Sequence, residues 1–236
     1  GSFYVHLDWH AAHYVKVLAD EIFGYENFIN DITWKRQTAH SDYKQGAKHL
    51  GRIHDSILFY SKVVEKNYLK TLFTDYSEAY AGSSYKYTDP DGRRYSLGDI
   101  TGPGGERKGN PYYEFLGIKR YWAFSKENIQ KMYERGEIIQ TKPGTVPRRK
   151  RYLDEMPGTP IQSIWDDIPS VQSQAEEKTD YPTQKPTALL KRIIESSCPI
   201  NGLILDAFMG SGTTCKVAEQ LADDLHCTWI GIDNSK

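Results

Sequence analysis

The hydrophobic pattern changes its period between the first two segments of the chain. Residues 2–8 (SFYVHLD) are rich in aromatic and β-branched side chains, which predicts a short strand. In residues 11–24, apolar side chains recur at the spacing of one helical face: Ala12, Val15, Leu18 and Ile22. Gly24 follows where such a helix would end. The pattern therefore predicts a strand followed by an amphipathic helix.

Two further apolar segments predict strands, residues 27–35 (NFINDITWK) and residues 54–62 (HDSILFYSK). The polar and basic residues between them predict a long loop, and several lysines and arginines lie in it.

Regular spacing returns close to the end of the chain. In PTALLKRIIESSC, which begins at Pro186, the apolar residues share one helical face: Leu189, Leu190, Ile193 and Ile194. The nearly all-apolar residues 202–208 (GLILDAF) predict a strand covered on both faces, as in a parallel sheet. A helix over residues 213–222 and a strand over residues 228–233 complete a β-α-β unit. Strands alternate with helices at both ends, which predicts an α/β fold.

Residues 65–178 lose this regularity and are dense in Gly, Pro, Asp and Tyr, which is typical of turns and short extended pieces. Residues 125–138 form the one clear helix there, with Ser125 as its N-cap and Gly136 near its end. We therefore expect three regions, residues 1–64, an inserted module over residues 65–178, and residues 179–236.

Composition indicates the cellular compartment in which the protein is expected. The 236 residues contain no apolar run near the roughly 18 residues that a membrane span needs, and no signal-peptide pattern opens the chain. The three cysteines are odd in number and have no C-x-x-C spacing: Cys198, Cys215 and Cys227. This pattern argues against a disulfide or a metal site and favours a cytoplasmic protein.

The net charge is −1, but its distribution is uneven. Residues 103–151 hold 12 Lys or Arg against 5 Asp or Glu, whereas residues 152–180 hold 7 acids and a single lysine. A basic, aromatic-rich block indicates an anionic partner such as nucleic acid. A solvated loop region is the alternative interpretation.

The stretch LDAFMGSGTTCKVAEQL, residues 205–221, contains a candidate ligand-binding loop. Gly210 and Gly212 allow a sharp turn and a close approach of a ligand to the backbone. The helix that begins near Thr213 directs its N-terminal amides over the loop. Asp233 ends the next strand 21 residues after Gly212, where doubly wound domains place the acid that binds the ribose hydroxyls of a nucleoside. The stretch predicts a nucleoside-cofactor pocket.

The loop excludes two common cofactors. G-x-G-x-x-G fails at Cys215, and no G-K-[ST] is present, which argues against a dinucleotide and against a P-loop. Asp206 would repel a pyrophosphate but would suit a cationic amino group, so S-adenosylmethionine fits best. A purely structural strand–helix turn is the alternative.

LDAFMGSGTT resembles the cofactor motif Asp-Pro-Phe-x-Gly-Ser-Gly-Thr-Thr of DNA amino-methyltransferases, with Ala207 in place of proline. YPTQKPTALLKRII resembles the other cofactor motif of that family. Their order is typical of circularly permuted, bacterial restriction-modification enzymes that methylate adenine N6 or cytosine N4. The resemblance covers nearly the whole chain.

The resemblance implies a role for each cofactor residue. Asp206 would lie near the methionine ammonium, and Phe208 would form an apolar wall. The backbone of four residues would cradle the cofactor: Gly210, Ser211, Gly212 and Thr213. Asp233 would bind the ribose, and Thr183 and Lys185 would approach the methionine carboxylate.

The resemblance also implies a Rossmann-like methyltransferase sheet, circularly permuted, with an inserted irregular target-recognition module. The family's Asp-Pro-Pro-Tyr-like catalytic motif does not occur in residues 1–236. In the permuted order it would precede residue 1, on a central strand between those of residues 203–206 and 3–7. No catalytic residue is therefore assigned, and we expect this chain alone to bind cofactor weakly and to transfer no methyl group.

The partner implied is double-stranded DNA. Candidate contacts come from the loop after residue 35 and from the module: Lys35, Arg36, Lys44, Lys48, Arg52, Arg107, Lys108, Lys119, Arg120, Trp122, Arg148, Arg149, Lys150 and Arg151. An exposed gap in the sheet would also invite a homodimer. Two alternatives stay open: a catalytically dead DNA-binding remnant, and a methyltransferase that acts on RNA or protein.

Overall fold

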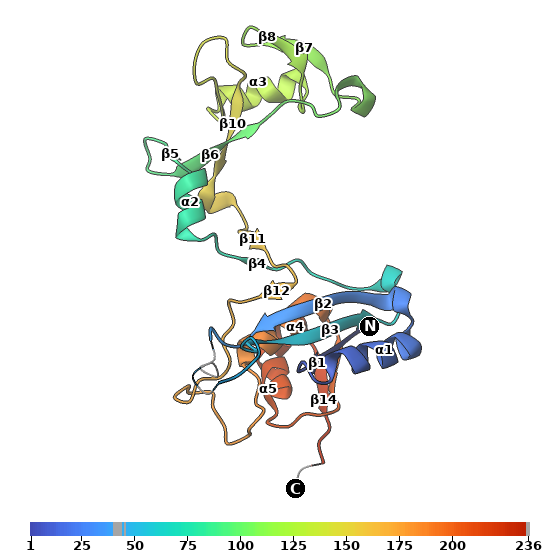
Figure 1. The fold of residues 1–236 in the computed structure, drawn as a ribbon. Helices are drawn as coiled ribbons and strands as arrows, with labels where there is room; N and C mark the ends of the chain where they lie inside the picture. Colours follow the sequence, from blue (N-terminus) through green and yellow to red (C-terminus); the bar gives the residue numbers. More distant parts are fainter. Residues whose placement is uncertain (40–43, 45, 235–236) are drawn as a thin grey trace. The chain divides into compact units, whose positions relative to one another are not determined.

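A computed structural model describes residues 1–39, 44 and 46–234, and the chain forms two compact units (Figure 1). The first unit combines residues Gly1–Phe73 with Pro160–Lys236, and the second unit is Thr74–Thr159. Two short strands, β4 (Phe73–Thr74) and β11 (Thr159–Pro160), make the connections and pair with each other.

The main sheet of the first unit has the order β1-β3-β2-β12. Its strands are β1 (Ser2–Leu7), β3 (His54–Ser61), β2 (Phe28–Lys35) and β12 (Ile164–Trp165). β3 runs antiparallel to both β1 and β2, and β12 runs parallel to β2. The predicted strands over residues 2–8, 27–35 and 54–62 are thereby confirmed.

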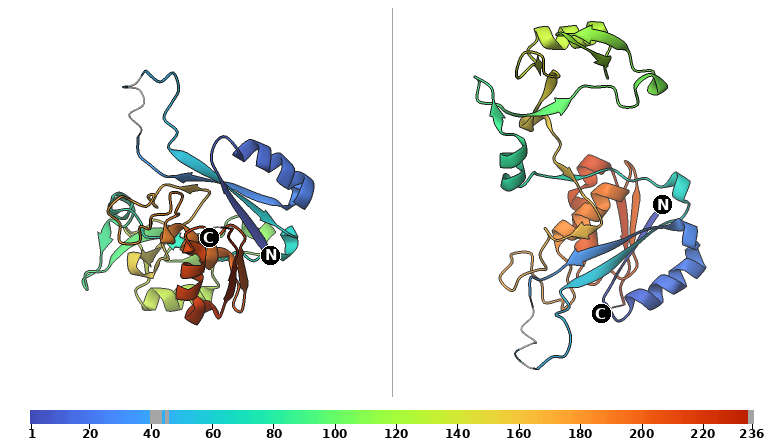
Figure 2. Two further views of the ribbon diagram at one scale, coloured as in Figure 1. Left: turned by 90° about the horizontal axis from the view of Figure 1, so that it is seen from below. Right: turned by 45° about the horizontal axis from the view of Figure 1, so that its top comes forward.

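Helices cover both faces of this sheet (Figure 2). On one face, Leu58 and Tyr60 of β3 pack with Ala19 of α1 (Ala12–Phe23). On the other face, Ile57 and Phe59 share a core with Leu189 of α4 (Thr187–Ser197). β3 is buried on both sides, which explains its continuous apolar run.

The C-terminal part is a β-α-β unit. β13 (Leu203–Asp206) pairs in parallel with β14 (Thr228–Gly231), and α5 (Thr213–Gln220) connects them, followed by the short α6 (Ala222–Leu225). α5 packs against α4, where Val217 and Ala218 are buried with Ile194. The predicted helices and strands of this region are confirmed.

The two sheets of the first unit are separate. Within the described residues, β1 pairs only with β3, and β13 pairs only with β14. The side chains on β13 are correspondingly open to solvent, with Leu203 63% and Leu205 61% exposed. Each sheet therefore ends in a strand edge, at β1 and at β13.

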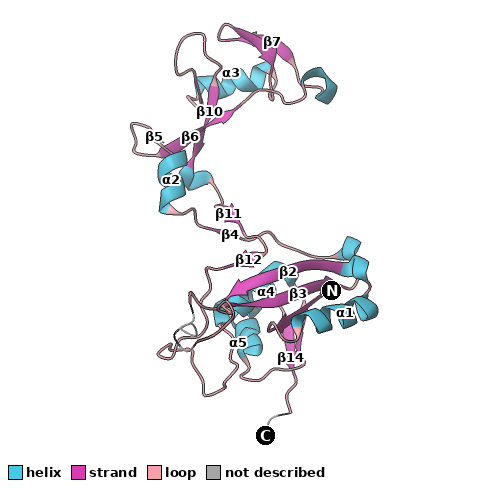
Figure 3. Ribbon diagram, viewed as in Figure 1, coloured by secondary structure: helices cyan, strands magenta, loops and turns pink. Residues whose placement is uncertain are grey.

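The strands of the second unit are all short (Figure 3). One sheet has the order β5-β6-β10-β9, with β5 (Tyr87–Thr88), β6 (Arg94–Asp99), β10 (Arg148–Tyr152) and β9 (Ile138–Ile139). A hairpin pairs β7 (Tyr112–Phe115) with β8 (Ile118–Tyr121), and the helices are α2 (Glu78–Ser84) and α3 (Lys126–Glu134). The predicted N-cap holds, because the Ser125 side chain accepts a hydrogen bond from the Asn128 amide.

The second unit is shorter than the module expected over residues 65–178. Residues 65–73 and 160–178 belong to the first unit. Trp165 and Ile168 are buried in the core of the main sheet, and the Trp34 indole donates to the Ile168 carbonyl at 2.8 Å. The irregular sequence hid these contacts, because two-residue strands such as β12 leave no periodic pattern.

The cysteines and the helices bear on two expectations from composition. All three cysteines are free thiols with buried side chains. Among residues 1–39, 44 and 46–234, no helix has the length and apolar character needed to cross a bilayer.

Candidate cofactor site

The glycine loop joins β13 to α5 and adopts a conformation that favours glycine at two positions. Gly210 has φ +52° and Gly212 has φ +74°, both in the left-handed region. A Cβ added to Gly210 would lie 2.8 Å from the ring of Tyr181. Tyr181 belongs to the YPTQKP segment, so the structure brings the two predicted cofactor motifs into contact at this glycine.

Asp206, at the end of β13, forms hydrogen bonds with the loop and with the first turn of α5. One carboxylate oxygen accepts from the Phe208 amide at 3.0 Å, and the other accepts from the Thr214 hydroxyl. Such bonds to the charged group hold the turn after the strand in place. Asp206 therefore brings a negative charge to the first turn of the loop.

Asp233, just beyond β14, also forms a hydrogen bond with the loop. Its carboxylate accepts a hydrogen bond from the Gly210 amide at 2.7 Å, and the Met209 amide donates to the Ile232 carbonyl at 2.9 Å. Two acids from the ends of neighbouring parallel strands thus meet at one glycine loop.

The N-terminus of α5 faces this loop without a side-chain cap. Thr213 is buried, and its hydroxyl lies 2.9 Å from the Ser211 hydroxyl. The first backbone amides of a helix need acceptors, so an uncapped end of this kind can bind a polar or anionic group. Phe208 is 93% exposed, and its ring offers an apolar surface beside the loop.

Lys185 and Thr183 lie on the turn that leads into α4. The Lys185 ammonium donates to the Thr183 carbonyl at 2.8 Å. Burial lowers the pKa of Lys185 below its ordinary value, the Asp55 carboxylate acts in the opposite direction, and the Arg36 guanidinium adds to the lowering. The turn therefore places a partly desolvated cation near the edge of the main sheet.

Asp55 organises that edge of the sheet. Its carboxylate lies 2.9 Å from His6 Nε2 and 3.0 Å from Arg36 Nε, and its side chain is only 10% exposed. The group links the ends of β1 and β2 with the start of β3. Sequence spacing alone did not reveal it, because its members are far apart in the chain.

Gly231 is a further residue that motif reasoning missed. A Cβ at this position would lie 2.3 Å from the Met209 sulfur and 2.7 Å from the Cys215 sulfur. The loop residue Met209 therefore packs over the end of β14 only because position 231 has no side chain.

The predicted DNA contacts of the first unit fall into two groups. Arg36 is engaged with Asp55, and the Arg52 guanidinium stacks 3.6 Å from the centroid of the Trp9 ring. Lys44 and Lys48 are exposed, and Lys35 is partly buried at the end of β2.

One predicted DNA contact in the second unit needs correction. Trp122 is 0% exposed and belongs to the core around α3, with its indole donating to the Tyr113 carbonyl at 2.9 Å. It cannot line a DNA groove, because its ring is enclosed by other side chains. Lys119 and Arg120 lie on the β7–β8 hairpin, whereas Arg148, Arg149 and Lys150 lie on β10.

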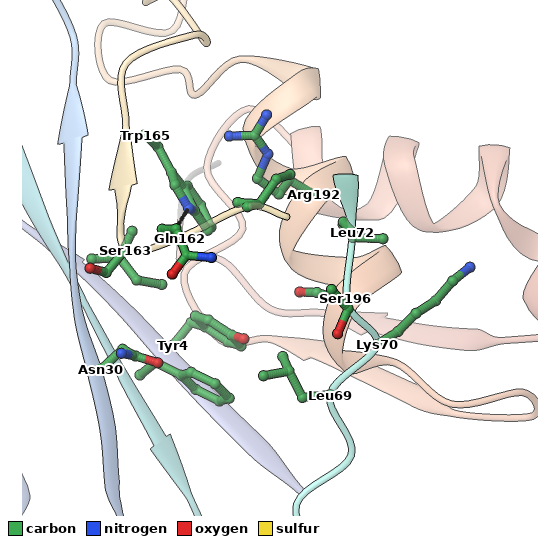
Figure 4. Close-up of a pocket in the computed structure, with 14 residues that line it drawn as sticks. Tyr4, Asn30, Leu69, Lys70, Leu72, Gln162, Ser163, Trp165, Arg192 and Ser196 are labelled. Carbon is green, nitrogen blue, oxygen red and sulfur yellow. Dashed lines mark hydrogen bonds between the residues drawn. The ribbon is translucent and has the colours of Figure 1, made fainter. Parts of the chain in front are cut away.

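A pocket of about 230 Å³ lies elsewhere in the first unit (Figure 4). It is lined by Tyr4 and Phe59, whose rings stack with centroids 4.3 Å apart, and by parts of the connecting segments and of α4. None of the predicted cofactor residues lines it. The glycine loop therefore lies outside this pocket.

A β-α-β unit with a glycine loop at a helix N-terminus, and an acid after the second strand, defines a nucleoside-cofactor-binding class of α/β protein. The N6/N4 DNA methylase family model matches residues 1–236, and the chain belongs to this family of DNA methylases.

Individual relatives agree with this family. Over 239 aligned residues, the chain is 31% identical to the type II methyltransferase M.EcaI of Enterobacter cloacae, covering 100% of the chain and 50% of M.EcaI. It is 25% identical to the type III restriction-modification enzyme StyLTI Mod subunit of Salmonella typhimurium, covering 95% of the chain and 36% of that protein. The chain therefore spans half or less of the length of these relatives.

Among solved structures, the chain resembles the M1.HpyAVI–SAM complex, with a TM-score of 0.45 and 16% identity. The match covers 100% of this chain and 69% of that one.

Proposed function

We propose that residues 1–236 supply the cofactor-binding and DNA-recognition parts of a DNA amino-methyltransferase. The enzyme would move a methyl group from S-adenosylmethionine to the exocyclic amine of adenine (N6) or cytosine (N4), in a restriction-modification setting. The observation that carries the proposal is the contact between the two cofactor motifs, where Tyr181 packs on Gly210. Family membership supports the reaction class.

The residues at the loop fit S-adenosylmethionine chemically. Asp206 offers a carboxylate for the methionine ammonium, and Asp233 offers one for ribose hydroxyls. The uncapped end of α5 and the Lys185 ammonium offer partners for the methionine carboxylate. When bound, the cofactor supplies an electrophilic methyl group on a cationic sulfonium.

Each part of the chain would have its own task in that reaction. The first unit would bind and orient the cofactor through the loop and the YPTQKP turn. The second unit would hold double-stranded DNA, and the target base would leave the duplex to reach the methyl group. The exposed Phe208 ring would shield the cofactor from water.

The catalytic strand is proposed to come from outside residues 1–236. No Asp-Pro-Pro-Tyr-type tetrapeptide is present in the chain. Among the residues that the structure describes, one edge of β1 and one edge of β13 have no partner strand, and Leu203 and Leu205 are exposed on β13; these features support a further strand between the two sheets. This arrangement would match the circularly permuted order of the two cofactor motifs.

The alternative function is a catalytically dead DNA-binding remnant, which would hold DNA and cofactor without transferring a methyl group. The third possibility, an RNA or protein acceptor, shares the cofactor half and differs only in the partner.

The test has two arms on the purified chain. Calorimetry should detect weak S-adenosylmethionine binding that is lost in Asp233→Ala and retained in the control Asp224→Asn, an exposed acid on α6. Radiolabelled methyl transfer to duplex DNA should be absent for this chain and present when a segment with the tetrapeptide is supplied. Clear turnover by residues 1–236 alone would refute the missing-strand proposal. Absent cofactor binding would refute the cofactor site, and methylation of RNA or protein instead of DNA would change the acceptor.

A further inference from the structure

The strongest basic run of the sequence, on β10, is partly neutralised within the second unit. The Lys150 ammonium lies 2.6 Å from the Asp89 carboxylate, with both side chains under 15% exposed (13% and 14%). Arg149 lies 3.7 Å from Glu137, and Arg148 stands opposite Asp99 in the β10–β6 ladder. Two of the four cations of this strand, Arg149 and Lys150, are therefore in ion pairs, whereas Arg148 only faces a carboxylate across the ladder.

The fourth cation of β10 is held against the sheet. A Cβ added to Gly98 would lie 2.4 Å from Arg151 Nε, so the Arg151 guanidinium rests on the backbone of β6. A phosphate approaching β10 would therefore compete with these internal partners before it gained a new one.

The β7–β8 hairpin presents the opposite arrangement. Tyr112 and Tyr121 face each other across the ladder with ring centroids 4.8 Å apart, and Tyr112 is 54% exposed. The Lys119 ammonium lies 5.9 Å from the centroid of the Tyr112 ring. Glu114, opposite Lys119 in the ladder, is the acid on this face. The result is an aromatic pair, with Tyr112 exposed and Tyr121 half-buried, and a cation at its edge.

A glycine-rich loop before the hairpin adds two more cations. Gly104 and Gly105 have positive φ values of +83° and +54°, and a Cβ on Gly105 would lie 3.2 Å from the Tyr121 ring. The loop backbone thus lies against this tyrosine. It carries the exposed side chains of Arg107 and Lys108 in the short helical turn Gly105–Lys108, where Glu106 is the only acid.

Hydrogen bonds hold this loop in shape. The Asn110 side-chain amide donates to the Pro103 carbonyl at 3.1 Å and to the Gly105 carbonyl at 3.2 Å. The Gly102 amide donates to the Tyr121 carbonyl at 2.9 Å. Behind the hairpin, the fully buried Trp122 packs with Phe115. The loop and hairpin are therefore preorganised, which lowers the entropy lost on binding a partner.

We propose that these five residues, Arg107, Lys108, Tyr112, Lys119 and Tyr121, form the surface on which the second unit holds the backbone of double-stranded DNA. We call them the hairpin surface. The proposal rests on the function proposed above and assigns the contact to this surface instead of to β10. In the part of the chain that the structure describes, the ion pairs include none of Arg107, Lys108 and Lys119.

The chemistry favours DNA as the occupant. Unpaired cations gain most from phosphates, because binding releases counterions without breaking an internal ion pair. Tyrosine hydroxyls and backbone amides of a loop also donate to phosphate oxygens and set the register of a protein on the duplex. On β10, Arg149 and Lys150 already have a carboxylate as ion-pair partner, and Arg151 rests on the backbone of β6.

The test compares two variants that lose equal charge. The hairpin variant carries Arg107→Gln, Lys108→Gln and Lys119→Gln. The matched β10 variant carries Arg148→Gln, Arg149→Gln and Arg151→Gln. Binding of the full chain to a fluorescent duplex is measured by anisotropy over a salt series, and circular dichroism with a thermal melt checks that both variants fold.

We expect the hairpin variant to lose at least tenfold in affinity at low salt. The slope of log K against log salt should become shallower by about 2 to 3, since each phosphate contact contributes about 0.9. The β10 variant should change this slope by less than about 1. A third variant, Tyr112→Phe, should weaken binding and leave the salt slope unchanged.

The outcomes separate this inference from the proposed function. If wild-type chain binds duplex DNA but both triple variants weaken it equally, only net charge matters and the hairpin assignment is overturned. A larger loss in the β10 variant overturns it as well. If wild-type chain shows no salt-dependent duplex binding, or prefers RNA, the DNA function fails together with the inference.

Discussion

The carboxylate of Asp233 accepts a hydrogen bond from the backbone amide of Gly210 at 2.7 Å, across 23 positions of sequence. The bond joins the acid beyond β14 to Gly210, the loop residue on which the Tyr181 ring also packs. An acid that binds a ribose hydroxyl would thus be oriented by the loop that holds the rest of the cofactor.

This relationship predicts different effects for two substitutions of Asp233. Asp233→Asn keeps an oxygen that can accept from the Gly210 amide, so the fold should be nearly unaffected. Asp233→Ala removes the acceptor and should lower the free energy of unfolding by roughly 1–2 kcal/mol. If Asp233 binds the ribose as proposed, both should weaken S-adenosylmethionine binding, because both remove the charged acceptor. Chemical denaturation and calorimetry measure the two effects, and equal destabilisation by both variants would contradict the geometry.

The contact at Gly210 predicts a clash on substitution. Gly210→Ala should destabilise the chain by about 1–3 kcal/mol, because the residue has φ +52° and its Cβ would lie 2.8 Å from the Tyr181 ring. Adding Tyr181→Ala should recover only the part of the lost stability that comes from the clash with the ring. The part that comes from backbone strain at Gly210 remains. Thermal melts of the two single variants and the double variant give the stabilities for a double-mutant cycle. Full additivity of the two effects would argue that Tyr181 does not press on Gly210.

Lys185 predicts a pH dependence of cofactor binding. Its pKa is lowered mainly by burial, so it should lose its charge at a lower pH than an exposed lysine, and affinity for the methionine carboxylate should fall there. Asp55 opposes the lowering, so Asp55→Asn should move this fall to still lower pH. Calorimetric titration at several pH values measures the shift.

The effect of Lys185 on stability has the opposite sign to its effect on binding. The folded chain releases the proton more readily than the unfolded chain, so the free energy of unfolding contributed by Lys185 should rise with pH between the folded and unfolded pKa values. Lys185→Met removes both dependences and is the control. A pH-independent affinity would show that the lysine does not meet the cofactor.

Asp89 predicts acid sensitivity of the second unit. Hydrogen bonds from Lys150 and then from Tyr152 lower the pKa of its carboxyl. A carboxyl with a lowered folded-state pKa stabilises the fold above its unfolded pKa, and this contribution is lost as the pH falls through the folded pKa. Asp89→Asn should flatten that part of the stability–pH curve, whereas the exposed control Asp91→Asn should leave it unchanged. Melting temperatures across the acid range measure it.

The open edge of β13 predicts self-association. Among the described residues, β13 pairs with β14 along one edge only, so its other edge and the exposed side chains of Leu203 and Leu205 offer backbone groups and apolar area to a second copy of the chain. Light scattering should show mass increasing with protein concentration, and Leu205→Lys should suppress the increase. Val17→Lys, an equally drastic change on the 58% exposed position of α1, should not. A monomer at all concentrations would remove the homodimer from consideration.

Local sequence carries the elements at both ends of the chain and the glycine loop. Periodic apolar residues determine α1, α4 and α5, because helix spacing is a property of neighbouring residues. The need for glycine at Gly210 and Gly212 is equally local, since it follows from backbone conformation. These signals were sufficient to predict the strand–loop–helix site and the acid beyond it.

Partners distant in the sequence decided the rest. Lys150 pairs with Asp89, 61 residues away in the sequence. The charge that β10 offers to a partner therefore cannot be derived from the sequence of the strand alone. The burial of Trp122 and the return of β12 to the main sheet likewise depend on which segments pack together. Composition can show that a region is basic, but only the folded chain determines which cations keep their charge free for a partner, because ion pairing depends on distance in space and not along the chain.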